Sequence, residues 1–280
     1  MTMASKRLMG LIAGLLVLVG GAATVGAFDP FDNWVNPAGW YAVAYPFHYN
    51  AQEMTDKKGN VALSNADLHL TQTILRVAYY NNQHCVFNAY IPVGRTDILG
   101  YHNTGIGDPT FVGGYFFVDD KKSNTYVGLG LKVDAPWGAY DKTRVANMGS
   151  NIWRYRPLLS FAKLIMPVDL EAILYYDVKT ENKDTHVNAG DLVEFESYAG
   201  YFLNQQWLAG LHFNATSGGD EEISGVKQQG TEIRDYQLGG SVTWMPTQKF
   251  SVMLQAIQDV APRNTFKGTL ILSRIVYKFK

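Results

Sequence analysis

The stretch DLVEFESYAGYFLNQQWLAGLHFNATS, residues 191–217, contains two runs in which apolar and polar side chains alternate. The apolar positions are Val193, Phe195, Ala199, Tyr201 and Leu203, then Trp207, Ala209, Leu211, Phe213 and Ala215. A period of two on both sides of residues 204–206 predicts two antiparallel strands joined by a tight turn. Each arm has about ten residues, enough to cross a bilayer at the usual barrel tilt, whereas soluble strands usually have about five or six. The pattern therefore predicts part of a membrane barrel wall, with lipid outside and water inside.

The start of the chain has the features of a secretory signal peptide. Lys6 and Arg7 precede an apolar run that ends in the cleavage-site sequence VGA at residues 25–27. A membrane-anchoring helix is the alternative, but the apolar run is short for a span. We therefore expect residues 1–27 to be removed on export and residues 28–280 to form one barrel domain.

Composition narrows the class of protein further. Removal of Lys6 and Arg7 leaves 22 basic and 25 acidic residues, a net charge of about −3, which gives no reason to expect nucleic-acid binding, since that requires a clustered basic surface. Cys85 is the only cysteine, so no intrachain disulfide can form. No later run reaches 18 apolar residues, so membrane residence would require strands. The mean hydropathy of −0.10 fits a barrel, because lipid-facing residues alternate with lumen-facing ones.

Strand-like segments continue along the chain, separated by alternately short and long connections. The twelve expected strands lie near residues 40–49, 67–79, 85–93, 111–117, 127–133, 153–161, 168–178, 193–203, 207–215, 236–244, 250–256 and 266–279. Short turns are expected near residues 81, 120, 166, 205 and 247, and long loops at 51–65, 94–107, 135–151, 180–190 and 217–230. This asymmetry is typical of outer-membrane barrels, in which short turns face the periplasm. An even strand number then places both ends of the barrel domain on that side.

Local features add to this prediction of an all-β, transmembrane, up-and-down barrel. The apolar parity changes between Ile74 and Leu75, which predicts a β-bulge within residues 67–79. Aromatic girdles are expected at strand ends, which carry Trp40, Trp153, Trp207 and Trp244. A soluble sandwich or lectin also has alternating strands, but it would hide its aromatic faces between two sheets. Twelve long strands in one meander favour the membrane barrel.

The motif GIGDPT at residues 105–110, followed by VGGY at 112–115, resembles the family labelled "MetA-pathway of phenol degradation". The motif VGLGL at residues 127–131, the segment around residues 135–138 and the ending at 270–279 are similar to the same family. The resemblance implies a barrel in the bacterial outer membrane that takes up small hydrophobic or aromatic compounds passively. It also implies the lipid bilayer and the barrel-assembly machinery as partners.

The end of the chain departs from the usual assembly signal of such barrels. Phe279 is followed by Lys280, and Arg274 replaces the small glycine that is usual upstream. Ile275 and Tyr277 keep the expected alternation. We therefore expect Phe279 and Tyr277 to carry what remains of the signal.

Residues of the opposite parity are expected to face the lumen. The candidate lumen residues are Arg154, Arg156, Asp169, Glu171, Tyr175, Asp177, Glu194, Glu196, Tyr198, His212 and Asp235. A turn at Met166-Pro167 predicts a register in which paired residue numbers sum to 333, so that Arg156 faces Asp177. A three-residue turn at 204–206 likewise pairs Tyr198 with His212 and Glu196 with Asn214. These residues either form a polarised constriction or make salt bridges that stiffen the wall.

Glycines on the lumen side are expected to leave open space. They are Gly114, Gly128, Gly130, Gly200, Gly210 and Gly239, and the aromatic residues expected beside them are Phe116, Tyr126, Tyr175 and Tyr198. A lumen of glycine and aromatic residues suits a hydrophobic or aromatic ligand.

An outer-membrane hydrolase of the lipase type and a structural barrel with a filled interior are the alternatives. A hydrolase needs a nucleophile and a base, but the sequence has no Gly-x-Ser-x-Gly motif and its six histidines fall on different segments. His-x-x-x-His and EF-hand spacings are also missing from the sequence. We therefore expect a non-enzymatic channel without a cofactor or metal.

Overall fold

The computed structural model describes residues 31–279, so the expected signal peptide lies outside the described residues. The strands are β1 (Gly39–Thr55), β2 (Val61–Tyr80), β3 (Cys85–Ile98), β4 (Tyr101–Ile106), β5 (Thr110–Asp120), β6 (Thr125–Asp134), β7 (Arg154–Ile165), β8 (Val168–Lys179), β9 (Val187–Asn188), β10 (Leu192–Phe202), β11 (Trp207–Gly218), β12 (Glu222–Ile223), β13 (Val226–Lys227), β14 (Arg234–Thr247), β15 (Phe250–Asp259) and β16 (Phe266–Lys278). Within residues 31–279, no helix has the length and apolarity that a membrane span requires.

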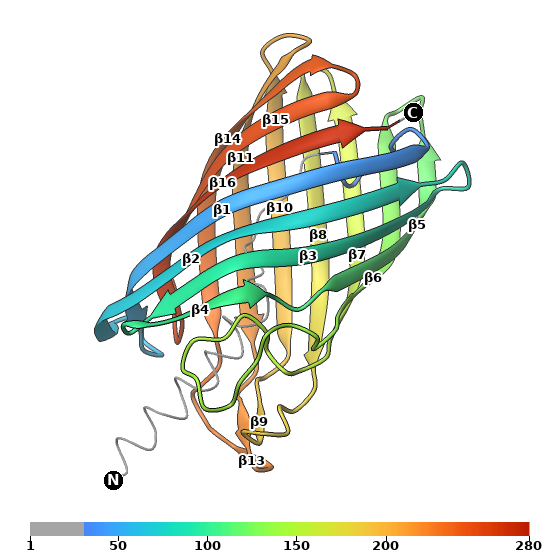
Figure 1. Cartoon of the computed structure of the whole chain (residues 1–280). Helices are drawn as coiled ribbons and strands as arrows, with labels where there is room; N and C mark the ends of the chain where they lie inside the picture. The colour runs from blue at the N-terminus through green and yellow to red at the C-terminus, as the bar shows by residue number, and fades with distance from the viewer. Residues whose placement is uncertain (1–30, 280) are drawn as a thin grey trace.

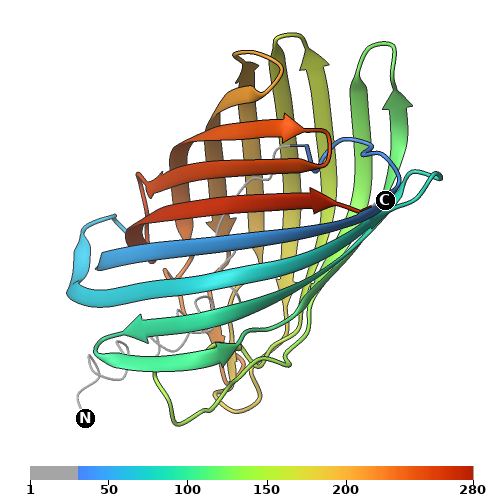
Figure 2. The ribbon, with the colours of Figure 1, turned by 45° about the horizontal axis from the view of Figure 1, so that its top comes forward.

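The long strands form one closed antiparallel barrel (Figures 1 and 2). Each strand pairs with its neighbour in the sequence, β1 pairs with β16, and the β2–β3 pairing completes the ring. Strands β4 and β5 both pair with β3 and act as one wall strand interrupted at residues 107–109. The wall therefore has twelve strands, which confirms the predicted architecture.

The two ends of the barrel differ in the length of their connections. The connections 81–84, 121–124, 166–167, 203–206 and 248–249 are short and lie at the end where β16 finishes (Figure 1). The connection 135–153 and the small sheet of β9, β12 and β13 lie at the opposite end. Because short turns of such barrels face the periplasm, we name these the periplasmic and the extracellular end.

The side chains alternate as the sequence predicts. On β8, Leu174 and Tyr176 point outward and are 44% and 48% exposed, whereas Asp177 points inward and is fully buried. Strand pairs β7–β8 and β10–β11 have the expected registers, with Leu159 opposite Leu174 and Tyr198 opposite His212. The outer surface is therefore apolar along the middle of the wall, as a lipid-facing surface must be.

Aromatic girdles also form where they were expected. Trp207 and Trp244 stack with their ring centroids 6.2 Å apart, and Trp40 lies 4.8 Å from Tyr79, both near the periplasmic end. Near the extracellular end, Trp153 contacts a neighbouring tryptophan and a tyrosine at 6.2 Å each. These two belts mark the membrane boundaries on the outer surface.

Several wall strands extend beyond their predicted ends. The expected loop at residues 51–65 is mostly paired strand, since β1 and β2 continue to the Thr55–Val61 pair. The expected loop at 94–107 is a hairpin of β3 and β4. These predictions were wrong because strands outside the membrane need no apolar outer face, so a polar sequence does not mark their end.

The predicted β-bulge lies earlier than expected. Residues 68–80 pair with β1 without a register shift, and the irregularity falls at residues 65–67, where Asn65 and Asp67 have φ of 60° and 45°. The change of apolar parity between Ile74 and Leu75 has another cause. Leu68 points into the barrel and is 1% exposed, whereas Leu75 points outward and is 50% exposed. Both faces of this strand are therefore apolar in places.

Candidate functional site

One side of the lumen is lined by apolar side chains. We name this surface the apolar strip; it consists of Val43, Tyr45, Phe47, Leu68, Leu70, Met253, Ile257, Leu270 and Leu272. These residues come from β1, β2, β15 and β16, which are adjacent in the wall. Each is at most 7% exposed. The side of the lumen that the sequence left unassigned is thus mainly hydrocarbon, interrupted by the buried side chains of Gln72 and Gln255 and bounded toward the periplasmic end by Arg76 and Arg274.

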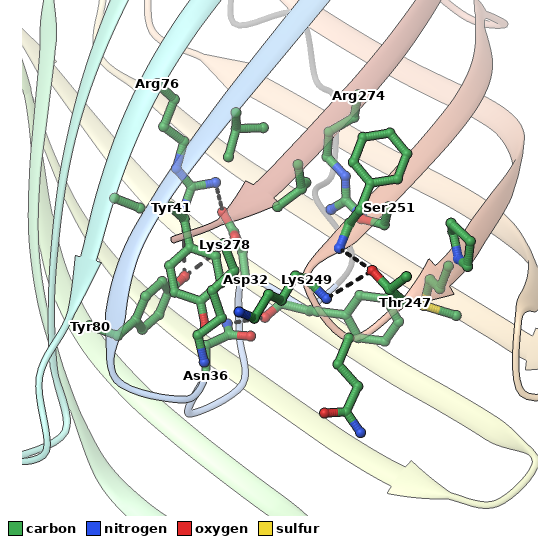
Figure 3. Close-up of a pocket in the computed structure, with 18 of the residues that line it drawn as sticks. Asp32, Asn36, Tyr41, Arg76, Tyr80, Thr247, Lys249, Ser251, Arg274 and Lys278 are labelled. Atoms are coloured by element: carbon green, nitrogen blue, oxygen red, sulfur yellow. Dashed lines mark hydrogen bonds and ion pairs between the residues drawn. The ribbon is translucent and has the colours of Figure 1, made fainter. Parts of the chain in front are cut away.

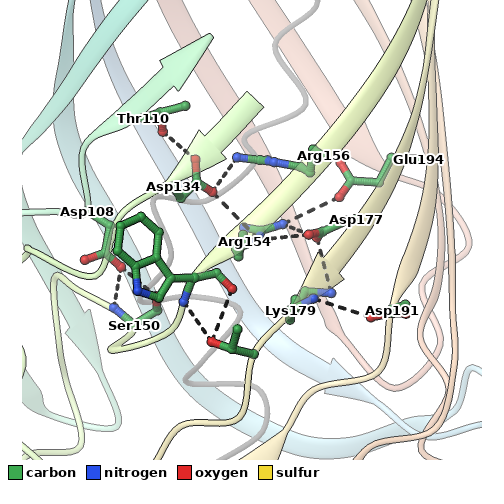
Figure 4. Close-up of polar contacts among 12 residues, drawn as sticks. Asp108, Thr110, Asp134, Ser150, Arg154, Arg156, Asp177, Lys179, Asp191 and Glu194 are labelled. Carbon is green, nitrogen blue, oxygen red and sulfur yellow. Dashed lines mark hydrogen bonds and ion pairs between the residues drawn. The ribbon is translucent and has the colours of Figure 1, made fainter. Parts of the chain in front are cut away.

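The other side of the lumen carries a cluster of buried charges near the extracellular end (Figure 4). Arg154 forms an ion pair with Asp177 on β8, and its guanidinium also lies 3.6 Å from Glu194 Oε1 on β10. Arg156 forms an ion pair with Asp134, the last residue of β6. The predicted residues Arg154, Arg156, Asp177 and Glu194 therefore do converge, although the side chain of Arg156 pairs with Asp134 and not with Asp177 opposite it.

Further contacts complete this charged cluster. Asp134 Oδ1 accepts a hydrogen bond from Thr110 Oγ1 at 2.6 Å. Lys179 Nζ lies 3.2 Å from Asp177 Oδ2 and donates to the carbonyl oxygen of Gly190 at 2.9 Å. Asp134 and Lys179 were missed, although their alternation with the lipid-facing residues of β6 and β8 would have identified both.

The charged cluster is balanced in charge and closed to water. Arg154, Arg156 and Lys179 face Asp134, Asp177 and Glu194, and each of the six is at most 5% exposed. Removing one partner of such a buried pair costs about 3–5 kcal/mol, because the other charge is left uncompensated. The arrangement favours the stiffening role over a selective constriction.

Below the charged cluster lies a small central cavity of about 90 Å³. Its lining includes Tyr175, Lys132 and Arg76. Lys132 Nζ lies 5.9 Å from the centre of the Tyr175 ring. The backbone of Glu196 lies on β10 opposite Ile173, another residue of this lining. Tyr175 therefore faces the lumen as predicted, beside a lysine rather than beside open water.

The segment before β1 enters the periplasmic half of the lumen. Glu171 accepts hydrogen bonds from the backbone N–H of Phe31 at 2.6 Å and from Asn33 Nδ2 at 2.9 Å. Trp34 stacks on Tyr126 with a centroid distance of 5.7 Å. The segment is therefore more than a lead-in to the first strand: it packs against the wall and narrows the lumen, and Glu171 is one of its anchors.

Tyr198 and His212 lie together deep in the wall of the periplasmic half. Their ring centroids are 4.9 Å apart. His212 Nε2 lies 2.7 Å from Ser241 Oγ, and Gln255 Nε2 lies 2.9 Å from His212 Nδ1. This places a serine hydroxyl and an imidazole within the reach that nucleophilic catalysis requires.

The serine–histidine pair does not have the other features of a hydrolase site. Gln255 Nε2 lies 2.9 Å from Nδ1 and 3.2 Å from Nε2 of His212, so this amide competes with Ser241 for the nitrogen that would act as the base. His212 and Ser241 are 2% and 6% exposed. Neither the central cavity nor the chamber described below includes Ser241 or His212. The pair is better explained as a hydrogen-bonded part of the wall.

The lumen glycines do not leave the open space that we expected. A Cβ on Gly210 would lie 2.1 Å from the Tyr198 ring, and one on Gly200 would lie 2.7 Å from it. A Cβ on Gly128 would lie 3.1 Å from the Phe116 ring. Gly128, Gly200 and Gly210 therefore provide room for aromatic rings, whereas a Cβ on Gly114, Gly130 or Gly239 would meet aliphatic side chains or backbone.

Asp235 lies beside a second carboxylate at the extracellular end. Its neighbour Asp259 accepts hydrogen bonds from Tyr49 Oη at 2.7 Å and from Gln237 Nε2 at 2.6 Å. This group is separate from the charged cluster, since it lies on β14 and β15. The predicted site residues thus divide into several local groups rather than forming one constriction.

The loop between β6 and β7 folds over the extracellular end of the lumen. Asp108 Oδ1 accepts a hydrogen bond from the N–H of Gly138 at 2.8 Å, and Oδ2 accepts from the N–H of Ser150 at 2.7 Å and from its hydroxyl at 2.5 Å. We name residues 138–150 the inner loop. Its residue Ala146 packs against the apolar strip. The Gly-Asp-Pro motif thus provides a clamp for this loop.

The inner loop depends on close backbone contact. A Cβ on Gly138 would lie 2.6 Å from the backbone nitrogen of Asp108, and one on Gly149 would lie 2.8 Å from the carbonyl carbon of Gly138. Met148 Sδ lies 3.4 Å from Thr96 Oγ1 on the inner face of β3. The loop therefore reaches into the lumen and covers the end of the apolar strip.

A larger cavity of about 520 Å³ lies at the periplasmic end (Figure 3). We name it the periplasmic chamber. Its lining includes Val43 of the apolar strip, two residues of the turn after β10, the end of β14 and the turn before β15. The apolar strip therefore extends from the inner loop at one end of the barrel to this chamber at the other.

Comparisons with known proteins place this geometry in context. The family model described as "Putative MetA-pathway of phenol degradation" matches residues 51–275. An outer membrane channel from Pseudomonas putida F1 has a similar structure, with a TM-score of 0.83, 20% identity, and coverage of 90% of this chain and 100% of that chain. The NanC porin has a TM-score of 0.54 and 10% identity, and the KdgM porin has 0.52 and 10%, each covering 85% of this chain and 99% of that chain. No curated protein matches the sequence.

Proposed function

Because the chain belongs to the MetA-pathway phenol-degradation family and is a twelve-stranded barrel of the bacterial outer membrane, we propose that it takes up small hydrophobic or aromatic molecules passively. The observation that carries this proposal is the apolar strip inside the lumen. Lumens of barrels that pass hydrophilic solutes are polar and filled with water. The strip residues are buried beneath the inner loop and their neighbours, so a hydrophobic solute would gain favourable contacts along this wall once the loop moves aside.

The opposite wall supports the same function by holding the barrel open. Six buried, balanced charges link β6, β7, β8 and β10, so this wall resists collapse onto the apolar strip. The absence of excess charge in the cluster leaves no strong field against a neutral solute. The hydrolase alternative is weaker, because Ser241 and His212 are buried and line neither of the two cavities.

The proposal is tested by uptake of labelled toluene at limiting concentration. A strain that lacks the protein and redundant porins should take up toluene more slowly than the same strain expressing the wild-type chain. The double substitution Leu270→Asn and Leu272→Asn should slow uptake, because it places two polar groups on the apolar strip. The lumen substitution Glu196→Gln on the other wall is the matched control and should leave uptake unchanged.

Equal uptake with and without the protein would contradict the proposal. Folded amounts of each variant are compared by migration on unboiled gels, so that a loss of uptake is not confused with a loss of barrel. Ester or phospholipid cleavage by the purified protein, abolished by Ser241→Ala, would favour the hydrolase instead.

A further inference from the structure

The periplasmic chamber combines positive charge with an aromatic and apolar lining. Four cationic side chains border it, namely Arg76, Arg274, Lys249 and Lys278, and the one carboxylate in its lining is Asp32. Figure 3 shows these side chains placed around one space. They come from β2, from β16 and from the turn before β15, so three separate parts of the barrel contribute positive charge to the same cavity.

The carboxylate in the chamber is already engaged. Asp32 Oδ2 lies 2.5 Å from Arg76 Nη1, which also donates to Tyr45 Oη at 2.8 Å. Among residues 31–279, no carboxylate lies within 4 Å of Lys249 Nζ or Lys278 Nζ. The chamber therefore holds a surplus of positive charge, in contrast to the balanced charged cluster at the other end.

The lining provides a complementary surface for an aromatic ring. Lys278 Nζ lies 5.6 Å from the centre of the Tyr41 ring, and Tyr41 lies 5.3 Å from Tyr80 in an edge-on arrangement. Val43, Val276 and Phe250 complete the apolar part of the lining. A volume of about 520 Å³ is within the range of small-molecule sites, which is about 300–1,000 Å³.

We propose that the periplasmic chamber is a binding site for aromatic carboxylates, with the ring against Tyr41 and the apolar residues and the carboxylate near Lys249 and Lys278. An ammonium group attracts a carboxylate from a distance, and the aromatic and apolar surfaces bind the ring by removing it from water. Because the apolar strip leads to the chamber, a solute that enters with its ring on the strip meets the cations as it leaves. The proposal rests on the proposed channel function for this route, but binding itself can be measured independently.

The test uses the purified full-length barrel in lipid nanodiscs, with sodium benzoate and its neutral counterpart benzamide as probes. Calorimetric titration should show tighter binding of benzoate than of benzamide. The double substitution Lys249→Gln and Lys278→Gln should weaken benzoate binding by about tenfold or more, because two nearby cations are lost. Its effect on benzamide should be small. Both lysines are exposed or half-buried, so the variant should fold.

A matched control removes the same charge at the same end of the barrel. Lys122 lies in the turn before β6 and Lys163 on the outer face of β7, and neither lines the chamber. The double substitution Lys122→Gln and Lys163→Gln should leave benzoate binding unchanged. Equal binding of benzoate and benzamide, or equal losses in the two double variants, would overturn the proposal. So would complete displacement of benzoate by equimolar inorganic phosphate, because the ring would then contribute nothing.

These outcomes differ from those that test transport. If toluene uptake does not depend on the protein but benzoate binding behaves as expected, the channel function fails and the chamber stands. If uptake depends on the protein but the lysine variant binds benzoate normally, the chamber assignment fails and the channel function stands.

Discussion

The two walls of the lumen are built from the same kind of strand but are stabilised in opposite ways. The wall of β6, β7, β8 and β10 buries three bases and three acids in ion pairs, whereas the wall of β15, β16, β1 and β2 buries mainly hydrocarbon between the inner loop and the cations Arg76 and Arg274 of the periplasmic chamber. Ion pairs fix the distance and direction between strands. Hydrophobic contacts have no preferred direction, so a solute can move along an apolar surface without losing them. The difference indicates that one wall holds the shape of the barrel and the other contacts the solute.

The largest effect is expected from breaking the charged wall. Asp177→Asn should lower the free energy of unfolding by about 3–5 kcal/mol, because Arg154 and Lys179 lose their buried partner. Urea unfolding in lipid vesicles, followed by tryptophan fluorescence, measures the change. The exposed pair of Glu53 and Lys267 provides the control, and Glu53→Gln should have no measurable effect. Equal stability of the two variants would mean that the charged cluster does not hold the wall.

A second prediction compares the outside of the charged wall with its inside. Leu174→Arg should destabilise the barrel by about 2–4 kcal/mol, because the charge faces the acyl chains, whereas Tyr175→Arg should cost less, because the side chain faces the lumen. The same unfolding experiment gives both values. A lipophilic quencher should quench a label at position 174 and not one at 175. Quenching at 175 alone would show that the register of β8 is wrong.

For the charged wall, the sequence was enough to predict which side chains face the lipid and which face the lumen. On β8, one parity is apolar without interruption, so Leu174 and Tyr175 could be assigned to opposite faces from the sequence. The short turn at residues 166–167 then fixed the register with β7. Where lipid lies on one side and buried charge on the other, alternation is unambiguous, and the sequence is sufficient.

The apolar wall could not be predicted in the same way. On β1, Val43 and Phe47 alternate with Ala42 and Ala44, so neither parity is charged and both faces can be buried. The structure points the larger side chains inward. Alternation indicates a face only when the two faces differ in polarity, and here they do not. The clamp of Asp108 on residues 138 and 150 was also beyond the sequence, because it depends on contacts between distant segments.

A third prediction tests whether the inner loop limits the access of solutes to the apolar strip. Asp108→Asn should weaken the clamp, because a charged acceptor of three hydrogen bonds becomes a neutral amide. Hydrogen bonds to charged groups are worth about 1.5–3 kcal/mol, so the open form of the inner loop should become about tenfold or more populated. Single-channel recordings should show longer or larger openings. Asp141→Asn, which alters only contacts inside the loop, with Thr143 and Arg144, should change conductance less.

If the Asp108 variant conducts as the wild type does, the inner loop does not limit access to the apolar strip. Toluene uptake provides an independent readout, since a loop that covers the strip should slow uptake until it opens. If the Asp108 variant takes up toluene faster but conducts ions as the wild type does, the inner loop controls the access of toluene to the apolar strip and not the flow of ions.

The smallest expected effect concerns residues 219–233, which contain β12 and β13 at the extracellular end, away from both walls; we name them the extracellular cap. Burial raises the pKa of Glu221 to about 7, above its usual value of 4.5. The folded cap therefore favours the protonated carboxyl, so its stabilisation is complete below about pH 4.5 and is lost as the pH rises through about 7. Amide hydrogen exchange of residues 219–233, corrected for intrinsic rates, should show less protection at pH 8 than at pH 5. Glu221→Gln should remove this dependence. Unchanged protection of the cap between pH 5 and pH 8 in the wild type would show that Glu221 does not control it.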